Sequence, residues 1–188
     1  MRPLLAIIGA VALLAGCAAP VVTTPSTLIT PADIPSGAVV ASPAASADAP
    51  APAVVPATLR FSGKTLDGAA FDATTMAGKP TILWFWAPWC ATCASEAQSI
   101  ADLAKEYRGQ LSILGIAGLG TNKAMHEFVS DLNVGDVPHL DDQAGAIWKK
   151  FKITQQSTYV FLDRAGQVVK TGYLDDLQLT AEVKTLVA

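Results

Sequence analysis

The feature that most constrains this chain is an apolar run that leads directly into a pair of cysteines. Residues 81–86 read TILWFW, a stretch of apolar, aromatic and β-branched residues that is typical of a buried strand. Pro88 ends this strand, and Cys90 and Cys93 follow it in a Cys-x-x-C arrangement. The next residues favour helix, so we predict a helix from about Cys90 to Tyr107 with both cysteines in its first turn.

The first turn of a helix favours the reactive form of cysteine. Its free backbone N–H groups and the positive end of the helix dipole stabilise a thiolate, and two cysteines three residues apart can close a disulfide. Two alternatives are half of a zinc site and a passive structural disulfide. Zinc usually takes four ligands, whereas this chain offers a third cysteine far away and two isolated histidines, His126 and His139. The pattern therefore indicates thiol–disulfide exchange, with no metal and no cofactor beyond the Cys90–Cys93 disulfide.

The N-terminus has the layout of an export signal. One positive charge precedes a short apolar stretch that ends at residue 16, which predicts a signal peptide over 1–16. The residues LAGC, ending at Cys17, resemble the lipobox of bacterial lipoproteins. That resemblance implies cleavage before Cys17 and attachment of a lipid to its thiol, palmitate among the acyl chains. The alternative is an ordinary signal peptide with a chance cysteine.

The segment that follows differs in composition from the rest. Residues 17–57 are dense in Ala, Pro, Val, Thr and Ser, and repeated prolines break helices, so we predict a disordered tether. Residues 58–188 remain as one domain. The chain's net charge of −3 comes with no basic patch, so nucleic acid is not an expected partner.

Within the domain, the pattern predicts an α/β fold with a mixed sheet covered on both faces. A hairpin is expected around the turn Leu66-Asp67-Gly68. The other expected strands cover 81–86, 111–117, 137–140, 158–162 and 168–171, and the helices 90–107, 123–132, 144–151 and 180–187.

The element order and several motifs resemble the thioredoxin fold, and in particular exported thioredoxin-like oxidoreductases of the TlpA, ResA and DsbE kind. The residues that carry the resemblance are GKP at 78–80, WFWAPWC at 84–90, IAGLG at 116–120 and ITQQSTYVFLDRAG at 153–166. Together they look closest to the secreted actinobacterial DsbE and DsbF proteins, some of which are lipoproteins. The resemblance spans about Leu59 to Val187 and implies an N-terminal hairpin added to a thioredoxin-like domain.

By this resemblance Cys90 is the attacking thiol and Cys93 the resolving thiol. Pro88, Trp89 and Trp86 are expected around the rim of Cys90, although Trp86 can equally be a core residue of the strand.

Three positions depart from the family pattern. Trp84 stands where cytoplasmic thioredoxins keep a buried carboxylate, which leaves Glu96 or water to accept the proton of the second cysteine, unless Glu96 is simply exposed. Gln98 replaces a helix proline, so a less kinked helix is expected. Ser157 replaces the family's cis-proline, and because a cis bond costs about 2.5–4 kcal/mol before other residues, we predict that Gln156–Ser157 is trans, with altered substrate docking there.

The function expected from these observations is a membrane-anchored thiol–disulfide oxidoreductase of the bacterial cell envelope, working in the oxidising direction. Its expected partners are exported thiol or disulfide proteins, a membrane redox protein, and the membrane itself through the lipid on Cys17. Two alternatives remain open: a reductase for cytochrome c maturation, and a copper- or haem-handling protein on a thioredoxin scaffold.

Overall fold

A computed structural model describes residues 55–188, and the predicted signal peptide, Cys17 and residues 18–54 of the tether lie outside the described part. The strands are β1 (Ser62–Lys64), β2 (Ala70–Asp72), β3 (Thr81–Trp86), β4 (Ser112–Ala117), β5 (His139–Asp141), β6 (Thr158–Leu162) and β7 (Val168–Gly172). The helices are α1 (Ala91–Glu106), α2 (Asn122–Asp131), α3 (Ala146–Lys150) and α4 (Asp176–Val187), with short 3-10 turns at Ala57–Leu59 and Ala73–Met76.

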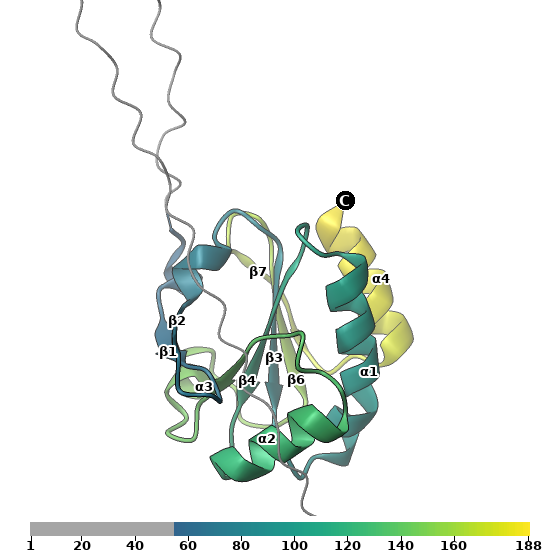
Figure 1. Ribbon diagram of the computed structural model, residues 1–188. Coiled ribbons are helices and arrows are strands. Elements are labelled where there is room, and N and C mark those ends of the chain that lie inside the picture. The colour runs from purple at the N-terminus through teal and green to yellow at the C-terminus, as the bar shows by residue number, and fades with distance from the viewer. Residues whose placement is uncertain (1–54) are drawn as a thin grey trace, which may run out of the picture. The chain divides into compact units, whose positions relative to one another are not determined.

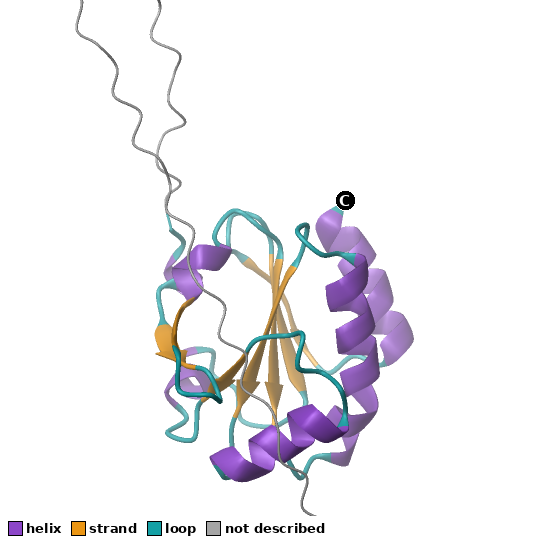
Figure 2. Cartoon of the chain, viewed as in Figure 1, coloured by secondary structure: helices purple, strands orange, loops and turns teal. Residues whose placement is uncertain are grey.

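Five strands form the central sheet, in the order β5-β4-β3-β6-β7, and β1 and β2 form a separate antiparallel hairpin (Figures 1 and 2). Strand β3 runs parallel to β4 and antiparallel to β6. In this register Trp84 lies opposite Gly115 on one side and Tyr159 on the other. The sheet is therefore mixed, as expected, and its central strand is the one that leads to the cysteines.

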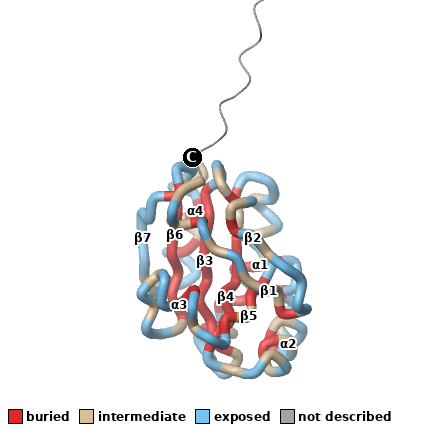
Figure 3. Tube along the Cα trace, turned by 90° about the vertical axis from the view of Figure 1, so that its left-hand side faces the viewer, coloured by how far each residue is buried: buried red, intermediate tan, exposed pale blue. Residues whose placement is uncertain are grey.

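Each face of the sheet has its own core. Alternate residues of β3 point to opposite faces, so Ile82, Trp84 and Trp86 pack with α1, α2 and α4. Leu83 and Phe85 pack on the other face with α3 and the 3-10 turns. Figure 3 shows the resulting pattern, with buried central strands and an exposed edge strand β7. Burial on both faces explains why β3 is apolar throughout.

The expected elements are present with small changes at their ends. The largest change is in α4, which begins at Asp176, four residues before the expected start at residue 180. A capping box explains the earlier start: the Asp175 side chain accepts from the Gln178 backbone, and the Gln178 side chain accepts from the Asp175 backbone. Sequence reasoning missed this D-x-x-Q signal.

The boundary between tether and domain also shifts. Val55 was expected in the tether, but it packs against the core that contains Leu83 and Phe85. The carbonyl of Ala57 accepts a hydrogen bond of 3.0 Å from Lys150 Nζ. The packed domain therefore includes at least residues 55–57. Among the described residues there is no helix long and apolar enough to cross a membrane.

Candidate active site

The two cysteines form a disulfide at the start of α1, with their Cα atoms 5.2 Å apart. Cys90 is the N-cap residue, and its Sγ accepts a hydrogen bond of 3.0 Å from the backbone N–H of Cys93. Cys90 keeps 7% of its surface exposed, whereas Cys93 is fully buried. A thiol or disulfide arriving from solution can therefore reach Cys90 and not Cys93.

An exposed aromatic side chain stands next to Cys90. Trp89 is 61% exposed, and its indole N–H donates a 2.7 Å hydrogen bond to the carbonyl of Leu119, in the loop after β4. Leu119 is also exposed, and it adopts a positive φ of 54°. Trp89 and the half-buried Pro88 line a pocket of about 580 Å³ that extends along α2. That Pro88 and Trp89 form the rim of Cys90 stays a prediction, and Leu119, which sequence reasoning did not single out, is tied to Trp89 by their hydrogen bond.

Trp86 does not belong to this rim. It is fully buried, stacks on Phe128 with ring centroids 4.3 Å apart, and donates its indole N–H to His139 Nδ1 at 3.2 Å. The expectation that Trp86 shapes the rim is therefore wrong, and its alternative as a core residue is correct. The physical reason is the period of the strand, which turns Trp86 toward the same buried layer as Trp84.

A buried carboxyl group lies one helical turn after Cys93. Glu96 is 2% exposed, so the alternative of an exposed helix glutamate is wrong. Its Oε2 accepts hydrogen bonds from Trp84 Nε1, at 3.1 Å, and from the hydroxyl of Ser157. Burial raises the pKa of Glu96, and the hydrogen bonds from Ser157 and Trp84 oppose that rise. The other oxygen, Oε1, is buried with no hydrogen-bond partner among the described residues.

Ser157 is buried just before the start of β6, and its hydroxyl also accepts from Trp84 Nε1 at 3.1 Å. The Gln156–Ser157 peptide bond is cis, so the prediction of a trans bond is wrong. That prediction weighed the local cost of the bond and omitted the partners from β3 and α1 that hold the Ser157 side chain. Gln156 itself is half-buried. Gln98 is exposed, and α1 continues through it without interruption.

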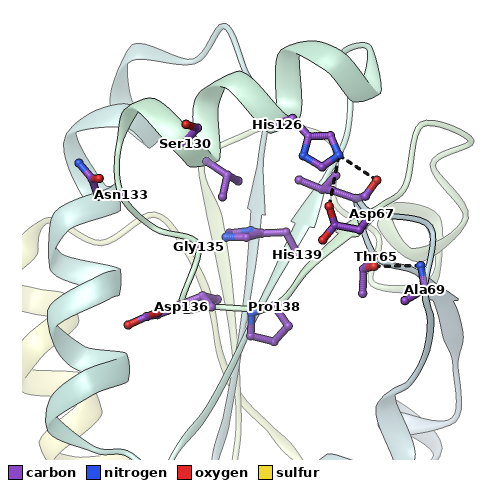
Figure 4. A pocket seen from close by; sticks show the side chains of 13 residues that line it. Thr65, Asp67, Ala69, His126, Ser130, Asn133, Gly135, Asp136, Pro138 and His139 are labelled. Atoms are coloured by element: carbon purple, nitrogen blue, oxygen red, sulfur yellow. Dashed lines mark hydrogen bonds and ion pairs between the residues drawn. The ribbon is translucent and has the colours of Figure 1, made fainter. Parts of the chain in front are cut away.

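The two histidines make hydrogen bonds to groups other than the cysteines. His139 donates from Nε2 to the Val134 carbonyl at 3.1 Å and accepts the Trp86 N–H at Nδ1. Burial lowers the pKa of His139 to about 4, so the ring is neutral near pH 7. His126 Nε2 lies 3.0 Å from the Leu66 carbonyl, at a pocket of about 770 Å³ between α2 and the hairpin turn (Figure 4).

Among residues 55–188, no three or more His, Cys, Asp or Glu side chains lie together in a way that could hold a metal ion.

The fold and the site together define a thioredoxin-like protein with a redox-capable disulfide at a helix start. A family model described as the AhpC/TSA family matches residues 54–171, and this chain belongs to that family.

Named relatives narrow the class. The chain is 38% identical to the soluble secreted antigen MPT53 of Mycobacterium tuberculosis over 108 aligned residues. The alignment covers 57% of this chain and 61% of the antigen. This chain therefore spans about three fifths of the length of that relative. Among solved structures it is similar to MTB DsbF, with 42% identity, a TM-score of 0.66, and coverage of 70% of this chain and 98% of DsbF.

A second structure is a secreted Mycobacterium tuberculosis disulfide oxidoreductase homologous to E. coli DsbE, at 34% identity and a TM-score of 0.63, covering 69% of this chain and 98% of the other. The thioredoxin-like fold and the resemblance to DsbE and DsbF proteins are therefore confirmed. The names of these relatives also agree with the prediction of an enzyme that acts on thiols and disulfides.

Proposed function

We propose that this chain is an extracytoplasmic thiol–disulfide oxidoreductase that exchanges the Cys90–Cys93 disulfide with exported proteins. The observation that carries this proposal is a disulfide closed across the first turn of α1, of which only Cys90 reaches the surface. Relatives that are secreted by name support an extracytoplasmic location.

In the oxidising direction, a substrate thiolate attacks Cys90 Sγ and forms a mixed disulfide. The Cys90–Cys93 bond breaks, and its electron pair leaves on Cys93, which takes up a proton. A second substrate thiolate then attacks the substrate sulfur of the mixed disulfide and releases the Cys90 thiolate. The substrate loses two electrons as its own disulfide forms, and the protein gains them as a dithiol.

The surroundings of Cys90 favour this direction. As a thiolate, Cys90 would sit at the positive end of α1 and accept the Cys93 N–H that its sulfur accepts in the disulfide form. Stabilising the Cys90 thiolate stabilises the reduced protein, which makes the disulfide a stronger oxidant. The resemblance to DsbE and DsbF proteins points the same way.

The test is capture of a mixed disulfide. Cys93→Ala protein that also carries Cys17→Ala, with Cys90 activated as a mixed disulfide, should form a lasting covalent adduct with an equimolar unfolded peptide that has a single cysteine. Neither Cys93 nor a second substrate thiol is then present to resolve the adduct. Cys90→Ser protein should form none. Equal adduct formation by the two variants would overturn the assignment of Cys90 as the attacking thiol.

The direction is tested separately with the wild-type chain. Oxidised protein should restore activity to reduced ribonuclease A faster than reduced protein precipitates insulin by cutting its disulfides. The opposite order would assign the chain to the reductases, as in the alternative role in cytochrome c maturation.

We also propose that Cys17 carries a lipid that anchors the mature protein to the envelope membrane. The support is the sequence LAGC at residues 14–17. In a bacterial host, the wild-type chain should partition into the detergent phase and take up labelled palmitate, and Cys17→Ala should do neither. A wild-type chain that stays in the aqueous phase without label would contradict the anchor.

A further inference from the structure

The exchange just proposed needs a proton at a thiol that is closed off from solvent. Cys93 is fully buried, yet it must gain or lose a proton in every cycle. Glu96 follows it by three residues on α1, a spacing that places the two side chains on the same face of the helix. Because Glu96 is also buried, its carboxyl group is the nearest candidate along the helix to exchange that proton.

We propose that Ser157 is a positioning residue that, with Trp84, holds Oε2 of Glu96 and leaves Oε1 as the oxygen that exchanges the proton with Cys93. This inference rests on the proposed function and adds to it the group that orients the carboxyl.

Three hydrogen bonds close this arrangement. The Trp84 N–H lies 3.1 Å from both Glu96 Oε2 and Ser157 Oγ, and the Ser157 hydroxyl donates to the same Oε2. Because both donors point at one oxygen, they fix the rotation of the carboxyl group. Trp84 lies in β3 and Ser157 immediately precedes β6, the strand that pairs with β3 in the sheet. A proline at position 157 would supply no donor, so this device depends on the serine.

The polar atoms left over are consistent with proton exchange. Glu96 Oε1 and the Tyr159 hydroxyl are both buried without a hydrogen-bond partner among the described residues. A buried polar atom without a partner costs free energy, and enzymes retain such atoms where chemistry uses them. Oε1 is therefore the carboxyl oxygen that Ser157 and Trp84 leave open, and the Tyr159 hydroxyl is the other polar group that faces this carboxyl.

The proton balance is closed by these groups. When the Cys90–Cys93 bond breaks, the Cys93 thiolate takes the proton from neutral Glu96 and leaves its carboxylate. In the reverse step, the carboxylate removes the proton from the Cys93 thiol, and the thiolate attacks Cys90 Sγ in the mixed disulfide. The substrate thiolate leaves with the electron pair of the broken bond.

Three other titratable groups face the Glu96 carboxyl from the elements packed around it. Tyr159 comes from β6, Asp176 from the start of α4, and Cys93 from α1 itself. The loop after β7 brings Tyr173 toward Tyr159. Burial is the largest cause of the raised pKa of Tyr159, so its hydroxyl stays protonated over the pH range of the experiment below. The charge of Asp176 raises the pKa of Glu96.

The experiment separates the two thiol steps in the full-length chain with Cys17→Ala as the common background, so that Cys90 and Cys93 are its two thiols. Reduced protein reacts with dithiobis-nitrobenzoate: Cys90 releases the first thionitrobenzoate, and Cys93 then releases the second as it closes the disulfide. The rate of the second release is measured against pH for the wild type and for Ser157→Ala, Ser157→Thr, Trp84→Phe and Glu96→Gln. Ser95→Ala is the matched control, because its exposed hydroxyl lies on the same helix but donates to the Thr92 carbonyl.

In the wild type, the second release should accelerate as pH rises through the pKa of Glu96. Ser157→Ala removes a donor to the carboxylate, so the midpoint should move up by about one pH unit. Trp84→Phe should move it in the same direction, and Ser157→Thr, which keeps the hydroxyl, should restore it. Glu96→Gln should abolish the inflection and slow the step by about a hundredfold.

The proposal is overturned if folded Ser157→Ala and Trp84→Phe both keep the wild-type midpoint, or if Ser95→Ala moves it as far as they do. Should Ser157→Ala fail to fold, Trp84→Phe and Ser157→Thr still decide the question. Failure of the proposed function would look different, because Cys90→Ser would then release the first thionitrobenzoate as fast as the wild type.

Discussion

Two tryptophans of the same strand donate to two buried titratable groups, with opposite results. Trp86 donates to His139, whose second nitrogen also has a partner in the Val134 carbonyl. Trp84 donates to Glu96, whose Oε1 has none among the described residues. Both ring nitrogens of the histidine have partners, so it serves as structure. The carboxyl has one oxygen without a hydrogen-bond partner among the described residues, one helical turn after Cys93. Complete hydrogen bonding is thus what separates a structural buried group from one available for chemistry.

The largest expected effect is a loss of folding stability at acid pH, and it tests the structural role of His139. Because the folded pKa of His139 is about 4 and the unfolded value is 6.5, protons bind the unfolded chain more tightly in between. The stability due to neutral His139 is fully present above pH 6.5 and is lost as pH falls through 4. The loss should reach about 3 kcal/mol, from about 1.4 kcal/mol per unit of pKa difference.

Urea unfolding of the wild type and His139→Gln between pH 7 and pH 4 measures this effect. The variant is expected to be less stable at pH 7, with a gap that narrows as pH falls. A gap that stays constant across the range would show that His139 is not held neutral.

The next effect concerns Gly115, whose missing side chain leaves room for the His139 ring. A Cβ added to Gly115 would lie 2.0 Å from His139 Nδ1 and 2.9 Å from Trp86 Nε1. Gly115→Ala should therefore displace the ring and destabilise the fold by about 1–3 kcal/mol in urea unfolding. Gly135→Ala is the matched control, because its nearest contact would be Val129 at an ordinary 3.7 Å. Equal stability of the two variants would contradict the tight packing of His139.

A change with an effect of similar size separates the two indole donors directly. Trp86→Phe keeps the aromatic packing but leaves His139 Nδ1 unpaired, which should cost about 1–3 kcal/mol in urea unfolding. It should leave the pH midpoint of thiol closure unchanged, whereas Trp84→Phe should move it. If Trp86→Phe moves the midpoint as much as Trp84→Phe, the two regions are not independent.

The smallest expected effect on stability is at the exposed rim. Trp89→Ala removes a side chain that is 61% exposed, so unfolding free energy should change by no more than about 0.5 kcal/mol apart from its bond to Leu119. Its effect should instead appear in the rate of reaction with reduced ribonuclease A, because Trp89 flanks Cys90. A large loss of stability with an unchanged rate would make Trp89 a structural residue.

The parts of this molecule that could be predicted from sequence depend on local patterns. The strand 81–86 and the helix that begins at the cysteines follow from periodicity and from Pro88, and both are present as expected. The hydrogen bonds of Glu96 could not be predicted, because Ser157 lies 61 residues away and only the sheet register brings it there. The cis bond before Ser157 was missed for the same reason.

The central claim is that Cys90 and Cys93 exchange electrons reversibly as a pair, and a redox titration tests it most directly. The fraction of oxidised protein is measured in glutathione buffers of graded ratio, with Cys90→Ser as the blank. We predict one reversible two-electron transition, with a potential between about −120 and −180 mV for an oxidant. A chain with no reversible transition, or one indistinguishable from Cys90→Ser, would contradict the account.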